Sequence, residues 1–343
     1  MEKNRLAFVR DGILGLAVGD AVGVPAEFKW RNTFKHNPVT DMTEYGTHFQ
    51  PKGSWSDDSS MTFCTMDSLC GGYDLDDMMK KFCDWMFRAE YTPWGTVFDS
   101  GISTRIALNK YMDGRPVLEC GGRDERSNGN GSLMRILPMV FFQREKYGDF
   151  LHSARKELIV PIHEVSAMTH AHPISMVGCG IYAQLIDALI RCREENADME
   201  MVRAKWAEDL EIIWNDYGWH NCGNLYEDPD FTDALEEYER LLTLEKFVNL
   251  PEDEIMSTGY VVYTLEAAIW CFLNTDNYRD CVLKAVNLGN DTDTVAAVAG
   301  SFAGIFYGTQ GIPKDWINSL ARLEWIEDLL ERFESALKSR NVF

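Results

Sequence analysis

The sequence predicts an all-α fold, and two observations lead to this prediction. Apolar residues recur at the three- and four-residue spacing of amphipathic helices in the windows 75–86, 199–213 and 326–337. Alternation of apolar and polar residues, the pattern of a half-buried strand, is hard to find anywhere in the chain. We therefore expect a compact helical bundle.

Two further windows, 177–190 and 260–273, are apolar nearly all round and rich in Ala, Gly, Cys and Ile. Helices of this kind are packed on every side, so we expect both at the centre of the bundle. Hydrophobic residues make up 45% of the 343 residues, which is enough to form a sizeable core around them.

The chain shows no fixed-period repeat, low-complexity tract or flexible linker, so a single domain over 1–343 is predicted. The stretch 215–257 is rich in acidic and aromatic residues and is a candidate surface excursion from that domain. Within it, Pro229 and Pro251 bracket a helix that we expect over 233–244.

Charge and cysteine content narrow the class of protein. A net charge of -21 opposes duplex nucleic acid, which is bound mainly by Lys and Arg, but suits metal cations. The nine cysteines are odd in number and include no Cys-x-x-Cys pair, so we expect reduced core thiols. The N-terminal apolar run 12–19 is too short for a spanning helix. We expect no membrane partner and a cytoplasmic location.

Two Asp-rich clusters stand out, Ser-Asp-Asp at 56–58 and Asp-Thr-Asp-Thr at 291–294, each directly before an apolar helical stretch. If the two met, their carboxylates and hydroxyls would offer the hard oxygen ligands that Mg²⁺ and Mn²⁺ prefer. The alternative is that each cluster only caps a helix. Two acids would suffice for capping, and four would repel one another without cations. The spacing leaves both interpretations open.

Other polar positions also have two interpretations when taken alone. The run Ser-Asn-Gly-Asn-Gly-Ser at 127–132 tolerates positive φ and could turn consecutive N–H groups toward a diphosphate, or it is a plain turn. Asp99 could bind a ligand or cap the helix expected from 102. Glu27 alone fits a surface carboxylate, and His170 alone fits a structural histidine.

Five blocks of sequence occur together in the order of a known family. They are Gly-Leu-Ala-Val-Gly-Asp-Ala-Val-Gly-Val-Pro-Ala-Glu-Phe at 15–28, Ser-Asp-Asp at 56–58, Phe-Asp-Ser-Gly with Thr-Arg at 98–105, Gly-Asn-Gly-Ser-Leu-Met-Arg at 129–135, and the stretch 259–294 that ends in Asp-Thr-Asp-Thr. With these blocks the chain resembles the ADP-ribosylglycohydrolase family, and they cover most of its length.

The resemblance implies a compact, single-domain helical bundle with a site for two Mg²⁺ or Mn²⁺ ions and no organic cofactor. The implied metal ligands are Ser56, Asp57, Asp58, Asp291, Asp293 and Thr294. Glu27 or a ligand carboxylate such as Asp58 is expected to handle the proton in catalysis. Asn290 stands where many relatives have Gly, and Ser56 stands where many have Thr.

The resemblance also implies the residues that hold the substrate. Asp99 corresponds to the residue that contacts the released ribose, and His170 to a histidine on the substrate side. The ADP-ribose-binding loop corresponds to Gly129, Asn130, Gly131 and Ser132. Ile102 stands where many relatives have Asn, so a polar contact expected there is missing.

The implied activity is removal of ADP-ribose from a modified protein or small-molecule conjugate. The five blocks look most like those of the bacterial branch in which this family was first defined. We therefore expect cleavage of the N-glycosidic bond of ADP-ribosyl-arginine. The alternatives are Ser- or nucleobase-linked ADP-ribose, or a relative that binds ADP-ribose without turnover. A prenyl-diphosphate enzyme is excluded, since Met61 replaces the third Asp of its first motif. None of the seven histidines precedes Asp, which disfavours helical His-Asp phosphohydrolases.

Overall fold

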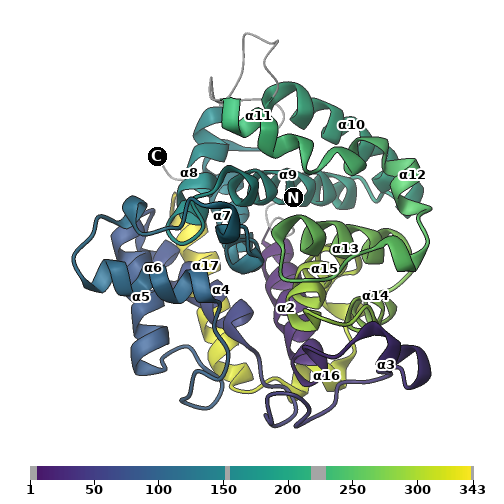
Figure 1. Cartoon of the computed structure of the whole chain (residues 1–343), viewed down its shortest axis with the longest axis horizontal. Helices are drawn as coiled ribbons and strands as arrows, with labels where there is room; N and C mark the ends of the chain where they lie inside the picture. Colours follow the sequence, from purple (N-terminus) through teal and green to yellow (C-terminus); the bar gives the residue numbers. More distant parts are fainter. Residues whose placement is uncertain (1–5, 151–154, 218–228, 341–343) are drawn as a thin grey trace.

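The structure is a computed structural model that describes residues 6–150, 155–217 and 229–340. These residues form helices joined by loops and short 3-10 turns, with three isolated bridges and no sheet among them (Figure 1). The predicted all-α fold is therefore confirmed.

An antiparallel pair of helices, α2 (Ala7–Gly23) and α15 (Thr292–Tyr307), lies at the centre of the molecule (Figure 1). A side chain at Gly15 or Gly19 would overlap a backbone carbonyl of α15, so glycine permits this close approach. Gly23, at the end of α2, packs in the same way against Asp293, at the start of α15. The pair therefore brings the chain after α2 beside the second Asp-rich cluster.

Two apolar helices pack around this pair, as their composition predicts. They are α9 (Pro173–Glu194) and α13 (Val261–Leu273), and most of the residues of α9 and nearly all of those of α13 are buried. By length and composition α9 could also cross a membrane, but 83% of its apolar window is buried inside the molecule. It is a central helix of the bundle.

The three amphipathic windows correspond to α5 (Leu75–Arg88), α10 (Met199–Tyr217) and α17 (Leu323–Arg340). Each buries its apolar face, with Phe82, Trp206 and Phe333 fully inaccessible. The other helices of the described residues are α3 (Arg31–His36), α4 (Asp57–Gly71), α6 (Ile102–Met112), α7 (Leu137–Tyr147), α8 (Arg155–Ala167), α11 (Pro229–Glu236), α12 (Leu244–Val248), α14 (Tyr278–Asn287) and α16 (Lys314–Ser319).

The prediction of one continuous helix over 233–244 is wrong. Helix α11 ends at Glu236, a 3-10 turn spans Glu239–Thr243, and α12 follows. The break lets Tyr238 enter the core, where its hydroxyl donates to the Ile174 carbonyl at 2.9 Å. The apolar pattern of neighbouring residues could not predict this contact, because Ile174 is far away in the sequence. The rest of 215–257 includes residues 218–228, which lie outside the described residues, and the one-domain organisation stays a prediction.

Candidate metal centre

The first Asp-rich cluster forms the start of α4. Ser56 is the N-cap, and its hydroxyl accepts from the Asp58 N–H at 3.3 Å and donates to Asp58 Oδ2 at 2.7 Å. Asp57 Oδ2 instead accepts from the Gly101 N–H at 3.3 Å, in the loop before α6. Capping therefore accounts for Ser56 but not for the Asp57 and Asp58 carboxylates.

The second cluster forms the start of α15. Asp291 is the N-cap residue, yet its carboxylate makes no capping hydrogen bond. Asp291 Oδ2 accepts from the Asn130 side chain at 2.8 Å, and Asp293 Oδ1 accepts from the Thr294 N–H at 3.0 Å. Asn290 adopts φ 62°, a left-handed conformation that Asn tolerates where many relatives have Gly.

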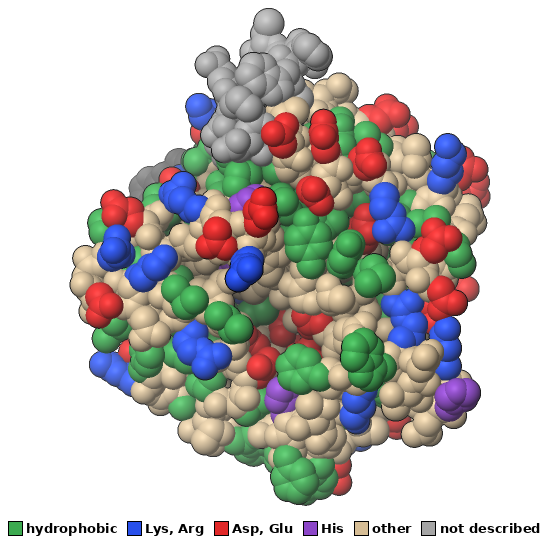
Figure 2. Space-filling view, viewed as in Figure 1, with side chains coloured by type: hydrophobic (Ala, Val, Ile, Leu, Met, Phe, Trp, Pro, Cys, Tyr) green, Lys and Arg blue, Asp and Glu red, His purple; other side chains and the backbone are tan. Residues whose placement is uncertain are grey.

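The two clusters meet. One carboxylate oxygen each from Asp20, Asp58 and Asp293 lies within 4.8 Å of the others, and Glu27, Asp291 and Asp293 form a second such group. Asp293 belongs to both groups. Figure 2 shows acidic side chains at the base of a hollow near the centre of the viewed face.

Three carboxylate oxygens in this cluster are buried without a hydrogen-bond partner among the described residues. They are Asp58 Oδ1, Asp291 Oδ1 and Asp293 Oδ2. Leaving a buried charged oxygen unpaired costs several kcal/mol, roughly, unless a proton or a cation compensates it. Their grouping and all-oxygen chemistry fit hard divalent cations. The acidic cluster could therefore hold metal.

The electrostatics of the cluster support the same conclusion. Burial, followed by repulsion from neighbouring carboxylates, raises the pKa of Asp57, Asp58 and Asp293 well above the usual range. Burial also raises the pKa of Asp291. Among the described residues, no Lys or Arg forms an ion pair with these four carboxylates. Cations from outside the chain would supply the missing charge.

Asp20 is a functional candidate that the sequence analysis missed. Its carboxylate accepts from the Ser56 N–H at 3.0 Å and from the Ser59 N–H and hydroxyl at 3.1 and 2.6 Å. It therefore anchors the start of α4 to α2, and burial raises its pKa to about 6. An Asp inside the long apolar run of α2 was the available signal, because an uncompensated buried carboxylate is rare.

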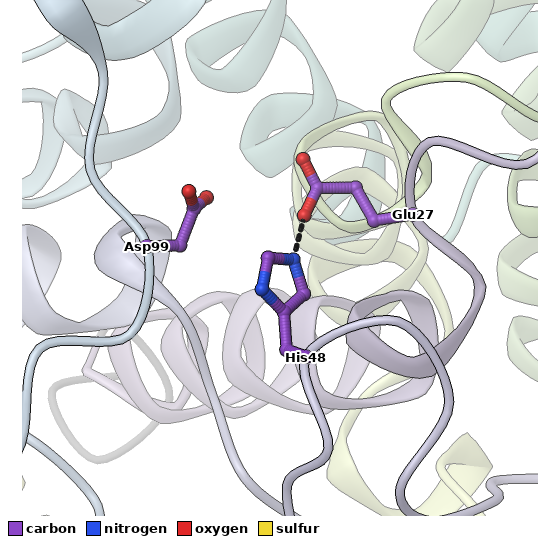
Figure 3. Close-up of side chains that lie close together, drawn as sticks. All are labelled: Glu27, His48 and Asp99. Atoms are coloured by element: carbon purple, nitrogen blue, oxygen red, sulfur yellow. Dashed lines mark hydrogen bonds and ion pairs between the residues drawn. The ribbon is translucent and has the colours of Figure 1, made fainter.

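Glu27 is grouped with Asp291 and Asp293 of the cluster and follows the 3-10 turn Val24–Ala26. Its carboxyl group contacts His48 Nε2, and Asp99 approaches from a third segment (Figure 3). Burial and then the charge of Asp99 raise the pKa of Glu27 to about 10. Asp99 is not a helix cap, since Gly101 precedes α6 without a side-chain cap. His48 carried no signal in the sequence.

The loop 129–132 is tied to the metal-ligand candidates through one side chain. Asn130 Nδ2 donates to Asp291 Oδ2 and to Thr264 Oγ1, and the Asn130 N–H donates to the Gly259 carbonyl. Although this run tolerates positive φ, its residues do not adopt it: Gly129 has φ -71°, and residues 130–135 form a 3-10 helix. The contact with α13 and α15 selects this compact turn. Gly131 serves close packing instead, whereas a Cβ on Gly129 would meet its neighbours at ordinary contact distance.

His170 packs behind this loop. A Cβ on Gly131 would lie 2.9 Å from His170 Cε1, and His170 Nδ1 contacts the Thr169 hydroxyl at 2.7 Å. Burial lowers the pKa of His170 to about 3, so the ring is neutral. Ser132 is fully buried and accepts from the Ser166 hydroxyl at 2.8 Å. His170 and Ser132 therefore support the loop, while Asn130 reaches the carboxylates.

The comparisons with known proteins agree over most of the chain. The model of the ADP-ribosylglycohydrolase family matches residues 1–341. An ADP-ribosylarginine hydrolase, Tri1 of Serratia proteamaculans, is 31% identical over 96% of this chain and 80% of its own length. An ADP-ribosyl-[dinitrogen reductase] glycohydrolase of Rhodospirillum rubrum is 26% identical over 90% and 88%. A solved ADP-ribosylglycohydrolase-related protein complex has a TM-score of 0.73, 29% identity and coverage of 98% and 99%.

Proposed function

This chain belongs to the ADP-ribosylglycohydrolase family and is a glycosyl hydrolase, and from that premise we propose that it cleaves the N-glycosidic bond of ADP-ribosyl-arginine with two divalent metal ions. The substrate would be an ADP-ribosylated protein or a small-molecule ADP-ribosyl conjugate. The arginine linkage is supported by the 31% identity to a relative with that printed activity over nearly the whole chain.

The observation that carries the metal part of the proposal is the set of three unpartnered oxygens on Asp58, Asp291 and Asp293. The proposed ligands also include Ser56, Asp57 and Thr294, whose polar groups lie at the same two helix starts. Thr294 Oγ1 is 3.5 Å from Asp58 Oδ2, so the two helix starts touch. When bound, Mg²⁺ or Mn²⁺ would neutralise the cluster, hold the ribose hydroxyls and activate water.

The chain's own groups have separate tasks in the proposed reaction. The bond between the ribose anomeric carbon and the arginine nitrogen breaks, and water supplies the oxygen that replaces it. The buried Glu27 carboxyl group, whose pKa is raised first by burial and then by the charge of Asp99, gives a proton to the departing nitrogen. A carboxylate of the cluster accepts the proton from water. Asp99, which is grouped with Glu27 and is partly exposed, would contact the ribose.

The substrate loop would hold the diphosphate of ADP-ribose. The proposed residues are Gly129, Asn130, Gly131 and Ser132, with His170 packed behind them. Asn130 connects the loop to Asp291, so the substrate and the proposed metal ligands share one hydrogen-bond network. A displaced loop would therefore misplace the ribose relative to the carboxylates.

A panel of conjugates tests the substrate assignment. The protein is incubated with arginine-, serine- and nucleobase-linked ADP-ribose in the presence of Mg²⁺ or Mn²⁺, and free ADP-ribose is measured as product. We expect turnover of the arginine conjugate and loss of turnover with EDTA. Faster turnover of another linkage would reassign the acceptor. Tight binding of every conjugate without release of ADP-ribose would support a non-catalytic protein.

Two matched variants separate the proposed proton donor from the metal ligands. Glu27→Gln should abolish most turnover while Mn²⁺ still binds, measured by calorimetric titration. Asp58→Asn should lose both turnover and tight Mn²⁺ binding, since an amide is neutral and a poorer ligand. If Glu27→Gln keeps wild-type turnover, the proton is handled by Asp58 or another carboxylate.

A further inference from the structure

The loop 45–50 is anchored to the turn that carries Glu27. The Thr47 N–H donates to the Pro25 carbonyl at 3.1 Å, and the Thr47 hydroxyl donates to the Glu27 carbonyl at 2.6 Å. Gly46 has φ 42°, and a side chain there would overlap the Pro25 carbonyl. The loop is closed on itself by the Tyr45 N–H, which donates to the Gln50 carbonyl at 2.6 Å. These contacts fix its place beside Glu27.

His48 projects from this loop into the candidate site. Its ring contacts two aromatic rings, with centroids 5.7 Å from Phe28 and 5.2 Å from Phe98. The His48 and Glu27 side chains are only 9% and 6% exposed, and His48 Nε2 contacts Glu27 Oε2 (Figure 3). The Gln50 side chain donates to the His48 carbonyl at 3.1 Å and holds the backbone. The imidazole therefore has one defined orientation.

Apart from His48, the side chains grouped with Glu27 are the carboxyl groups of Asp99, Asp291 and Asp293. The charges of Asp99, Asp291, Asp57 and Asp58 all act against an ionised Glu27. Among the described residues, His48 is the one basic side chain that pairs with the Glu27 carboxyl group. Burial lowers the pKa of His48, so it makes this contact as a neutral ring.

We propose that His48 is a positioning residue that holds one carboxyl oxygen of Glu27, so that the group faces Asp291 and Asp293 during the reaction. The inference rests on the proposed acid/base role of Glu27. The geometry that carries it is the contact at Nε2, the contacts with the two rings and the anchored loop. His48 does not touch substrate and acts through Glu27.

Two variants separate the hydrogen bond from the packing. His48→Phe keeps an aromatic ring against Phe28 and Phe98 but removes the nitrogen, whereas His48→Gln restores a polar end without the ring. We expect kcat for ADP-ribosyl-arginine to fall roughly 10–100-fold in His48→Phe, a part of the 10²–10⁴-fold that a positioned acid or base contributes. His48→Gln should recover most of that loss. KM and the affinity for free ADP-ribose should stay near wild type in both.

His36 supplies the matched control, because it is exposed at the end of α3. His36→Phe and His36→Gln should leave kcat unchanged. In the Glu27→Gln background, His48→Phe should cause no further loss, since its effect passes through Glu27. An additive loss in that double variant would overturn the proposal, and so would a wild-type kcat in His48→Phe. Equal losses in His48→Phe and His48→Gln, with unchanged melting temperatures, would also overturn it.

A measurement without turnover distinguishes this inference from the proposed function. The ¹⁵N resonances of the His48 ring report its contact with Glu27 in the intact protein, and they should shift in Glu27→Gln. Unchanged resonances would show that the contact is absent in solution and overturn the positioning role. If the resonances shift but no conjugate is hydrolysed, the proposed function fails while the contact stands.

Discussion

Two of the regions that bury carboxylates differ in their charge partners: among the described residues, one has Arg side chains paired with its carboxylates and the other forms no ion pair with Lys or Arg. On α9 and α10, Asp187 and Asp209 are joined by Arg191, with N–O distances of 3.0 and 2.5 Å, and Arg144 also contacts Asp187. At the starts of α4 and α15, the candidate site buries its carboxylates beside one another. The first region is complete within the chain. The second is complete only with protons or cations from outside it.

The Arg-paired carboxylates of α9 and α10, which we call the paired region, should contribute to the free energy of unfolding and not to activity. Arg191→Met leaves Asp209 buried without its partner, and breaking a buried pair in this way costs about 3–5 kcal/mol. Denaturant unfolding should show this loss, with kcat unchanged in the folded protein. Lys80→Met is the matched control at the exposed pair with Asp76, where water screens the charges and the loss of stability should be much smaller. A fall in kcat for Arg191→Met would show that the paired carboxylates also affect activity, and the two regions would then not differ in this respect.

The carboxylates at the starts of α4 and α15, which we call the unpaired region, should contribute to activity and not to the stability of the metal-free protein. Asp293 belongs to both carboxylate groups, so Asp293→Ala should reduce turnover by roughly 100-fold or more, or about 3 kcal/mol. The metal-free variant should melt at or above the wild-type temperature, since one repelling charge is gone. The exposed Asp276→Ala is the control and should change neither quantity. Severe unfolding of metal-free Asp293→Ala would favour the capping interpretation.

The pH dependence of stability should also come from the unpaired region. Burial raises the folded pKa of Asp20 to about 6 from an ordinary value of 3.8, and that of Glu27 to about 10 from 4.5. Groups with raised folded values stabilise the protein below their unfolded pKa and lose that contribution as pH rises through the folded value. The metal-free melting temperature should therefore fall between pH 5 and pH 8.

Metal should oppose this fall. At a Mn²⁺ concentration 100 times its Kd, binding adds about 2.7 kcal/mol, and the effect should grow with pH as protons leave the ligands. Melting curves with EDTA and with Mn²⁺ measure both trends. A metal-free melting temperature that rises over this pH range would show that the carboxylates are already compensated.

The smallest expected effect is on the affinity for ADP-ribose, through the uncharged loop 129–132 of the candidate site. In Gly131→Ala, the new Cβ lies 2.9 Å from His170 Cε1 and 3.2 Å from Thr104 Oγ1, so the loop must shift. Affinity for free ADP-ribose should fall roughly tenfold, which matches an overpacking cost of about 1–2 kcal/mol. Mn²⁺ affinity should be unchanged in the same titrations. Gly71→Ala is the control, since nothing lies within 4 Å of its Cβ.

Much of the fold was predictable because helical periodicity is a local property. The windows that became α5, α9, α10, α13 and α17 each contain their own apolar pattern. The helix expected over 233–244 was not correct, because Tyr238 enters the core through a contact with Ile174, sixty-four positions away. A favourable burial of that kind overrides a continuous helix.

The candidate site was predictable in chemistry but not in its full membership. The two Asp-rich clusters attract notice by composition, since four carboxylates exceed what two helix starts need. Asp20 lies within a helix that otherwise looks like core, and His48 lies in an irregular loop. Their roles depend on neighbours at α4 and at Glu27. No spacing along the chain encodes those contacts.

The sequence by itself determined the helices that contain their own apolar periodicity, where α4 and α15 begin, and that their starts offer oxygen ligands, because caps and periodicity act over a few residues. Only the tertiary structure decided that these starts meet. The close approach of α2 to α15 at Gly19 and Gly23 carries Asp20 and Glu27 to Asp293, and burial there raises the carboxyl pKa values. Such shifts arise from a low-dielectric environment that long-range packing alone creates.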